Sequence, residues 1–139
     1  MDALEMTRLC AEVMGWKFFH SKHGHWEITD PNGNRHTVGF SSHKYDPYSG
    51  EKLPELTAGD ALLEAGYDPL HNDAQCFALV KKFQLQLSAY NVANELVWEA
   101  SFRLSPLSNY VWHHTEHPDL NRAVVECVAK MQQEKKHGR

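Results

Sequence analysis

The spacing of apolar residues switches along this chain, and the switch occurs twice in the same order. Residues 6–14 place apolar side chains three or four positions apart, which is the period of a helix with one buried face, and Gly15 follows as a stop. Residues 16–40 instead alternate apolar and polar side chains, as strands of a half-buried sheet do. Helices followed by short, closely spaced strands favour a layered fold in which helices pack on antiparallel sheet.

Three strands are predicted in the first half, over residues 16–20, 25–29 and 35–40. The segment 30–34, Asp-Pro-Asn-Gly-Asn, separates the last two and predicts a hairpin, because Asn and Gly tolerate the positive φ of a tight turn. One face of these strands is apolar and is predicted to be core. It carries Trp16, Phe18, Trp26, Ile28, Val38 and Phe40.

Residues 41–58 interrupt this pattern with turn-forming residues and no periodicity. A connection of this length inside a compact domain is usually either functional or disordered. A short helix is predicted over residues 59–65, and the segment 66–70 then turns the chain.

The second half repeats the order of helix and strands. A helix capped by Asn72 or Asp73 is predicted to bury an apolar stripe from Cys76 to Phe83. Strands follow over residues 84–89 and 96–102, with a turn over 91–94 and a further strand over 110–113. The last helix starts near Pro118 and buries an apolar stripe over residues 120–131, and the polar tail 132–139 is predicted to fray.

The predicted order is therefore helix, three strands, long loop with a short helix, helix, two or three strands, helix. It indicates an α+β fold of the layered α/β/α sandwich type, with helices packed on antiparallel strands. Parallel units are disfavoured because most connections are too short for a crossover. A chain of 139 residues has the length of one domain, and we expect residues 1–139 to form a single one.

Charge and composition exclude several functional classes. The net charge of −4 argues against general nucleic-acid binding, which favours a basic surplus. No apolar run approaches the roughly 20 residues of a membrane helix, and the first residues lack the regions of a signal peptide. Cys10, Cys76 and Cys127 are far apart and lie within helical apolar patterns, which indicates buried thiols in a reducing compartment. We expect a cytoplasmic protein.

Three stretches of the sequence resemble a known family. They are residues 11–16 followed by Trp26 and the turn 31–33, residues 67–75 continuing into 78–83, and residues 120–131. Together they are similar to the small phage and prophage proteins grouped as the phage ABA sandwich family, over most of the chain except residues 41–58. The resemblance implies an α/β/α layered fold, a phage or prophage origin and thus the cytoplasm of a bacterial host. It implies no catalytic motif, because the family has no settled biochemical role.

Histidines are the residues that favour a metal site most. Imidazoles bind zinc and other transition metals, and four of them lie on or beside the first two hairpins: His20, His23, His25 and His36. His23 and His25 are two positions apart, which puts both on one face if they share a strand. Solvated or sheet-surface histidines are the interpretation we favour, because no cysteine pair and no helical His-x-x-x-His accompanies them.

A second histidine cluster covers residues 112–117. His114 and His117 would share a turn of helix, with Glu116 nearby. A catalytic zinc site needs three ligands and an open position. The interpretation we favour is a strand-to-helix connection, in which His117 precedes Pro118 and is held out of helical geometry. No cofactor is predicted, and zinc or another transition metal is kept as the alternative.

Aromatic and basic residues gather in the irregular segments. Aromatic faces stack on bases, while Lys, Arg and protonated His pair with phosphates, so these segments favour a small anionic ligand. The same residue types are enriched at protein interfaces. The predicted ligand-binding residues are Lys44, Tyr45, Tyr48, Arg103, Tyr110, Trp112, His113 and His114.

No nucleophile motif and no phosphate-cradling glycine loop occurs, which argues against an enzyme. With the resemblance, this predicts a phage-encoded non-enzymatic accessory protein that acts on the host. Its most concrete form is counter-defence, either by sequestering a small nucleotide-type immune signal or by blocking a host defence protein. Two alternatives stay open: a metal-dependent hydrolase that uses the histidine clusters, and a virion or assembly protein. A homo-oligomer fits each of these functions.

Overall fold

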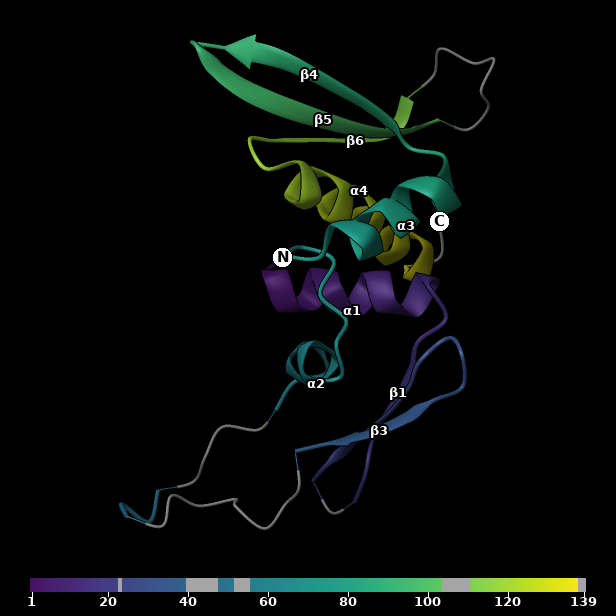
Figure 1. Cartoon of the computed structure of the whole chain (residues 1–139), viewed down its shortest axis with the longest axis vertical. Helices are drawn as coiled ribbons and strands as arrows, with labels where there is room; N and C mark the ends of the chain where they lie inside the picture. The colour runs from purple at the N-terminus through teal and green to yellow at the C-terminus, as the bar shows by residue number, and fades with distance from the viewer. Residues whose placement is uncertain (23, 40–47, 52–55, 104–110, 138–139) are drawn as a thin grey trace. The chain divides into compact units, whose positions relative to one another are not determined.

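The computed structural model describes residues 1–22, 24–39, 48–51, 56–103 and 111–137 (Figure 1). Within these residues there are four helices and two antiparallel three-stranded sheets, β1-β2-β3 and β4-β5-β6. The predicted α+β class with helices packed against sheets is confirmed. The elements in order are α1 (Ala3–Val13), β1 (Lys17–His20), β2 (Trp26–Thr29), β3 (Arg35–Val38), α2 (Ala58–Glu64), α3 (Asp73–Phe83), β4 (Gln86–Val92), β5 (Glu95–Arg103), β6 (Val111–His117) and α4 (Leu120–Lys136).

Contacts divide the chain into two compact units, and each is described by itself. The N-terminal unit is Asp2–Tyr67, and the C-terminal unit is Asp68–Arg139 with Met1. Folding of residues 1–139 as a single domain stays a prediction. None of the helices among the described residues has the length and apolar character needed to cross a membrane.

Close packing of α1 on α2 characterises the N-terminal unit. Asp2 caps α1 by accepting a hydrogen bond from the Glu5 backbone N–H at 2.8 Å, as an N-cap aspartate does. Thr57 and Asp60 form a capping box at the start of α2. A Cβ atom at Gly59 would lie 2.5 Å from the carbonyl oxygen of Leu4, so the two helices approach at a position that only glycine fits.

The β1-β2-β3 sheet buries one face, as the alternating pattern predicts. Ile28 and Val38 are 1% and 6% exposed, and the Phe18 ring packs edge-on against Trp26 at 6.4 Å. Phe40 lies outside the described residues. The predicted hairpin is confirmed as well, because the Asp30 carboxylate accepts from the backbone N–H groups of Asn32 and Asn34, each at 2.9 Å.

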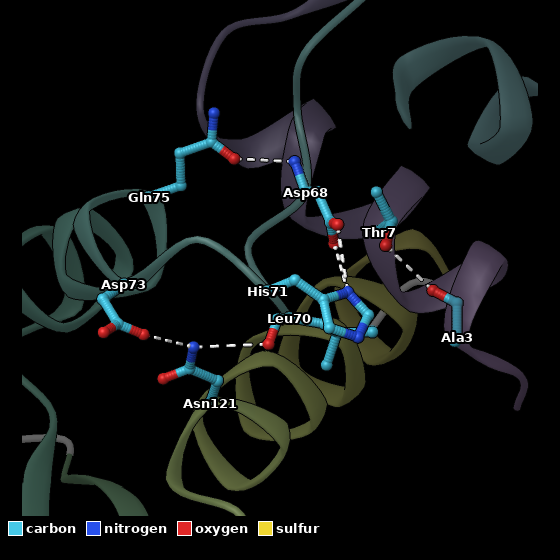
Figure 2. A network of polar contacts seen from close by, with 8 residues as sticks. All are labelled: Ala3, Thr7, Asp68, Leu70, His71, Asp73, Gln75 and Asn121. Carbon is cyan, nitrogen blue, oxygen red and sulfur yellow. Dashed lines mark hydrogen bonds and ion pairs between the residues drawn. The ribbon is translucent and has the colours of Figure 1, made fainter. Parts of the chain in front are cut away.

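The C-terminal unit opens with a turn that joins the starts of α3 and α4 (Figure 2). Asn72 caps α3, as predicted, and its side chain accepts from the Gln75 N–H at 3.0 Å. In α4, the Asn121 amide donates to the Leu70 carbonyl at 3.3 Å and to the Asp73 carboxylate at 3.0 Å. These bonds fix the first turn of α4 against the first turn of α3.

Helix α4 lies along one face of the β4-β5-β6 sheet and contacts β5 and β6 (Figure 1). The Thr115 hydroxyl donates to the Ala123 carbonyl, which ties β6 to the helix. On the covered face, Ala100 is fully buried and Thr115 is 4% exposed. The opposite face carries exposed Ser88, His114 and Glu116.

Several boundaries differ from the prediction because pairing, not local sequence, sets them. Gln84 adopts a left-handed conformation that ends α3, so β4 begins at Gln86 and the turn falls at Ala93–Asn94. Strand β6 continues to His117 because it pairs with β5 as far as Trp98. Helix α4 continues to Lys136 and so includes the first five residues of the predicted polar tail.

Candidate functional site

The outward face of the β1-β2-β3 sheet presents two cations in one row. Lys17 pairs with Thr29 on the neighbouring strand, and Thr29 pairs with Arg35 on the next. With strands about 4.8 Å apart, the Cα atoms of Lys17 and Arg35 lie roughly 10 Å apart across the hydroxyl of Thr29. Both cationic side chains are exposed, so both can reach a group placed over this row.

The next row of the same face pairs Phe19 with Glu27, and Glu27 with Thr37. Phe19 is 63% exposed, which is unusual for a large apolar ring on a sheet, and it stands beside the cationic row. These side chains border a hollow of about 310 Å³. Cations next to an exposed aromatic ring suit an anion that carries a flat ring.

Neighbouring acidic groups leave the two cations available. Glu27 faces His25, with its Oε1 at 3.6 Å from Nε2. Burial raises the pKa of Asp30, but hydrogen bonds from Asn34 and His36 outweigh it and leave that pKa below its ordinary value. Asp30 is therefore an ionised carboxylate that accepts hydrogen bonds from residues of its own hairpin. Within the described residues, no carboxylate forms an ion pair with Lys17 or Arg35.

The predicted histidine cluster of the first hairpins is divided between the two faces. His20 stacks on Trp26 at 4.7 Å, and His36 lies 6.5 Å from the Trp16 ring, on the apolar face. His25 bonds to the Ser21 hydroxyl at 2.9 Å on the other side, and His23 lies outside the described residues. The three described histidines thus have separate partners and do not converge on one metal position.

Most of the eight predicted ligand-binding residues, or their side chains, lie outside the part of the chain that the structure describes. Lys44, Tyr45 and Tyr110 lie outside the described residues, as do the side chains of Arg103 and Trp112. Tyr48 is 99% exposed. Only His113 and His114 remain, and as neighbours on β6 they point to opposite faces of the sheet.

His113 serves the packing of α4. Its Nε2 lies 3.0 Å from the Glu134 carboxylate, and its side chain is only 15% exposed. This pair joins β6 to α4 on the covered face of the sheet. His113 therefore contributes to the stability of the C-terminal unit.

His114 joins a polar cluster on the open face of the same sheet. Its Nε2 lies 3.0 Å from Glu116 and 3.8 Å from Glu99. A hydrogen bond to Glu116 raises the pKa of Tyr90 to about 12, so the phenol is a donor at neutral pH. The pKa of Glu116 is lowered by the hydrogen bonds from Tyr90 and His114. Glu116 is thus held as a carboxylate.

His117, in the second histidine cluster of the sequence, lies apart from His114 and Glu116. Because residues 111–117 form strand β6, His117 lies three positions from His114 and on the other face, where its Nδ1 accepts from the Asp119 N–H at 2.9 Å. The helical turn that the metal alternative requires for His114 and His117 is therefore absent, and the favoured interpretation of a strand-to-helix connection is confirmed. Strand alternation instead keeps His114 and Glu116 together, and pairing adds Glu99.

An apolar groove of about 420 Å³ lies between α3 and α4 in the C-terminal unit. Asp73 and Asn121 stand at its rim, and Phe77, Val80 and Leu87 line it. The carboxylate at the rim disfavours an anion. Burial, followed by the charges of Asp73 and Asp119, raises the pKa of Cys76 to about 11, so the thiol in this groove is protonated and a poor nucleophile.

All three cysteines are buried, as predicted. Burial is also the main reason that the pKa of Cys127 rises to about 12. Neither Cys76 nor Cys127 is a thiolate at neutral pH, which argues against cysteine nucleophile chemistry at either position.

The sequence interpretation missed Lys17, Phe19 and Arg35. The alternating apolar face of these strands predicts core, and no binding residue was predicted on the opposite face. The signal was nevertheless present, since alternation through residues 16–20 places Lys17 and Phe19 outward together. What alternation alone does not give is the register that sets Arg35 in the row of Lys17.

Comparisons of this chain with family models, with curated proteins and with solved structures found no match.

Proposed function

We propose that the protein is a phage-encoded, non-enzymatic accessory protein that binds and sequesters a small nucleotide-type immune signal of its host. The observation that carries the binding step is the cationic row of Lys17 and Arg35 beside the exposed ring of Phe19. The phage part of the proposal rests on the sequence resemblance alone. Cysteine nucleophile chemistry is disfavoured because Cys76 and Cys127 hold protonated thiols in buried positions.

Each group in the site has a defined part in binding. The phosphates lie over Thr29, where Lys17 and Arg35 reach them from either side; Arg can hold two oxygens at once, while Lys acts as a point charge. The base stacks on the Phe19 ring. Such stacking accepts any of the bases, because every base has a π-face. Glu27, in the row of Phe19, accepts hydrogen bonds from sugar or base donors and repels phosphate from that end.

The proposal is tested by isothermal titration calorimetry with ADP-ribose and with a cyclic dinucleotide. We expect heat of binding with at least one of them. Lys17→Ala and Arg35→Ala each remove a charged hydrogen bond of about 1.5–3 kcal/mol, which corresponds to a loss of affinity of roughly ten- to one-hundred-fold. Lys82→Ala, an exposed lysine on α3, is the matched control and keeps wild-type affinity.

Circular dichroism confirms that each variant is folded. The absence of heat with all anions tested, or equal affinity in Lys17→Ala, Arg35→Ala and Lys82→Ala, would refute the nucleotide proposal.

The alternative is that the protein blocks a host defence protein. The same face supports it, since an exposed aromatic ring near an arginine is typical of an interface hot spot. It predicts that Phe19→Ala abolishes capture of that host protein in a pull-down while no small anion binds.

A further inference from the structure

A second polar cluster, on the open face of the β4-β5-β6 sheet, contains Glu99, His114 and Glu116. One ligand atom from each of these side chains lies within 4.8 Å of the other two, and no other group of three potential metal ligands in the described part of the chain does so. Glu99 and Glu116 are directly opposite on β5 and β6, and His114 lies two positions from Glu116 on the same face. The backbone register therefore fixes the convergence of all three.

The arrangement places two carboxylates opposite each other on neighbouring strands. Like charges in this position destabilise a sheet, because their Cβ atoms are only about 5 Å apart. His114 approaches both carboxylates, but a neutral imidazole leaves two negative charges in the cluster. A cation between the strands removes this repulsion.

We propose that Glu99, His114 and Glu116 bind one divalent transition-metal ion, with zinc the best match. One imidazole nitrogen and two carboxylate oxygens are ligands that zinc accepts, whereas magnesium favours an all-oxygen, six-coordinate set. Three protein ligands leave a fourth position for water. This site shares His114 and Glu116 with the second histidine cluster of the sequence interpretation but has Glu99 in place of His117. It does not depend on the proposed nucleotide site, which lies in the N-terminal unit.

The distances suit this ion after small side-chain rotations. Ligands about 2.1 Å from a tetrahedral zinc lie about 3.4 Å from one another. His114 Nε2 lies 3.0 Å from Glu116 and 3.8 Å from Glu99, on either side of that value. Tyr90 hydrogen-bonds to Glu116 and orients that carboxylate, as outer groups around metal ligands commonly do.

The test is titration of zinc chloride into untagged, chelator-treated protein, followed by calorimetry and by NMR of the histidine ring signals. The wild type is expected to bind zinc at one site that shifts the His114 ring signals. His114→Ala, Glu99→Gln and Glu116→Gln are each expected to lose that site. Tyr90→Phe leaves every ligand in place and is expected to weaken binding about tenfold.

Two controls exclude general effects of histidine or charge removal. His71→Ala removes an exposed histidine outside the cluster, and Glu95→Gln removes an exposed carboxylate on the same strand and face as Glu99. Both are expected to bind zinc as the wild type does. The proposal is overturned if the wild type shows no zinc-dependent shift at His114, or if the cluster variants bind zinc as tightly as the two controls. Magnesium chloride, titrated in parallel, is expected to leave the His114 signals unchanged.

Discussion

At Glu116, two hydrogen bonds hold one carboxylate in its charged form. Tyr90 and His114 both donate to it, and together they lower the pKa of Glu116 below its ordinary value of 4.5. A carboxylate whose pKa is lower in the folded than in the unfolded state stabilises the fold above its unfolded pKa. That contribution is lost as the pH falls through the folded pKa.

Tyr90→Phe is therefore expected to raise the pKa of Glu116 toward its ordinary value, because the first of its two donors is removed. NMR titration of the side-chain carboxyl carbon measures this directly. The dependence of unfolding stability on pH below about 4.5 should also become shallower. Tyr48→Phe, which removes a hydroxyl from a 99% exposed ring, is the control and should leave Glu116 unaffected. An unchanged pKa in Tyr90→Phe would show that the phenol does not hold the carboxylate.

Single residues also mark the limit of the sequence interpretation. His113 and His114 were grouped as ligand-binding residues because of their type and their irregular context. One step along a strand reverses the face, so His113 packs on α4 while His114 joins Glu99. Residue type alone does not reveal this, because the strand that separates them is defined by pairing with β5.

At the scale of elements, the contact between α1 and α2 depends on Gly59. Alanine is favoured over glycine in a helix by about 1 kcal/mol, so Gly59→Ala would stabilise an isolated α2. In the folded protein, the new Cβ atom would lie 2.5 Å from the Leu4 carbonyl oxygen, a backbone atom that cannot rotate away. Overpacking costs about 1–3 kcal/mol, so after the gain in helix propensity we expect a net loss of up to about 2 kcal/mol in urea unfolding. A gain in stability would contradict this packing.

The attachment of α4 to the sheet gives a second prediction at this scale. Thr115→Val keeps the shape of the side chain but removes the hydroxyl that donates to the Ala123 carbonyl. We expect a loss of about 1 kcal/mol in the free energy of unfolding, measured in urea. Thr37→Val, at an exposed position on β3, is the control and should change stability by less than about 0.5 kcal/mol. Equal effects at both positions would rule out the bond as a stabilising contact.

Local signals predicted the elements well where they act alone. The cap at Asn72 and the hairpin at Asp30–Asn34 follow from residue chemistry within a few positions, and both are present. The limits of β4 and β6 depend on partners further along the chain, so the sequence predicted β6 too short. The row of Lys17, Thr29 and Arg35 needs the same long-range register, which explains why it was missed.

At the scale of the whole molecule, ten histidines make the charge sensitive to pH. With neutral histidines the net charge is −4, and protonation of all ten would change it to +6. An unperturbed histidine has a pKa of about 6.5, so the net charge of the chain becomes more positive as the pH falls from about 7.5 to about 5.5. Binding of an anionic nucleotide is expected to tighten over this range and to weaken in high salt. Calorimetry at the two pH values, with ADP-ribose as the probe, measures this change in affinity. An affinity that falls toward pH 5.5 would contradict the expected trend.

Binding of a nucleotide-type anion by the outward face of the N-terminal sheet is the property on which the proposed function depends. The most direct measurement is a titration of ADP-ribose and of a cyclic dinucleotide into isotope-labelled protein, followed by backbone amide NMR. We predict shifts centred on Lys17, Phe19, Thr29 and Arg35, and their loss in Arg35→Ala but not in Lys82→Ala. Shifts confined to residues 68–139, or no shifts with either compound, would contradict the claim.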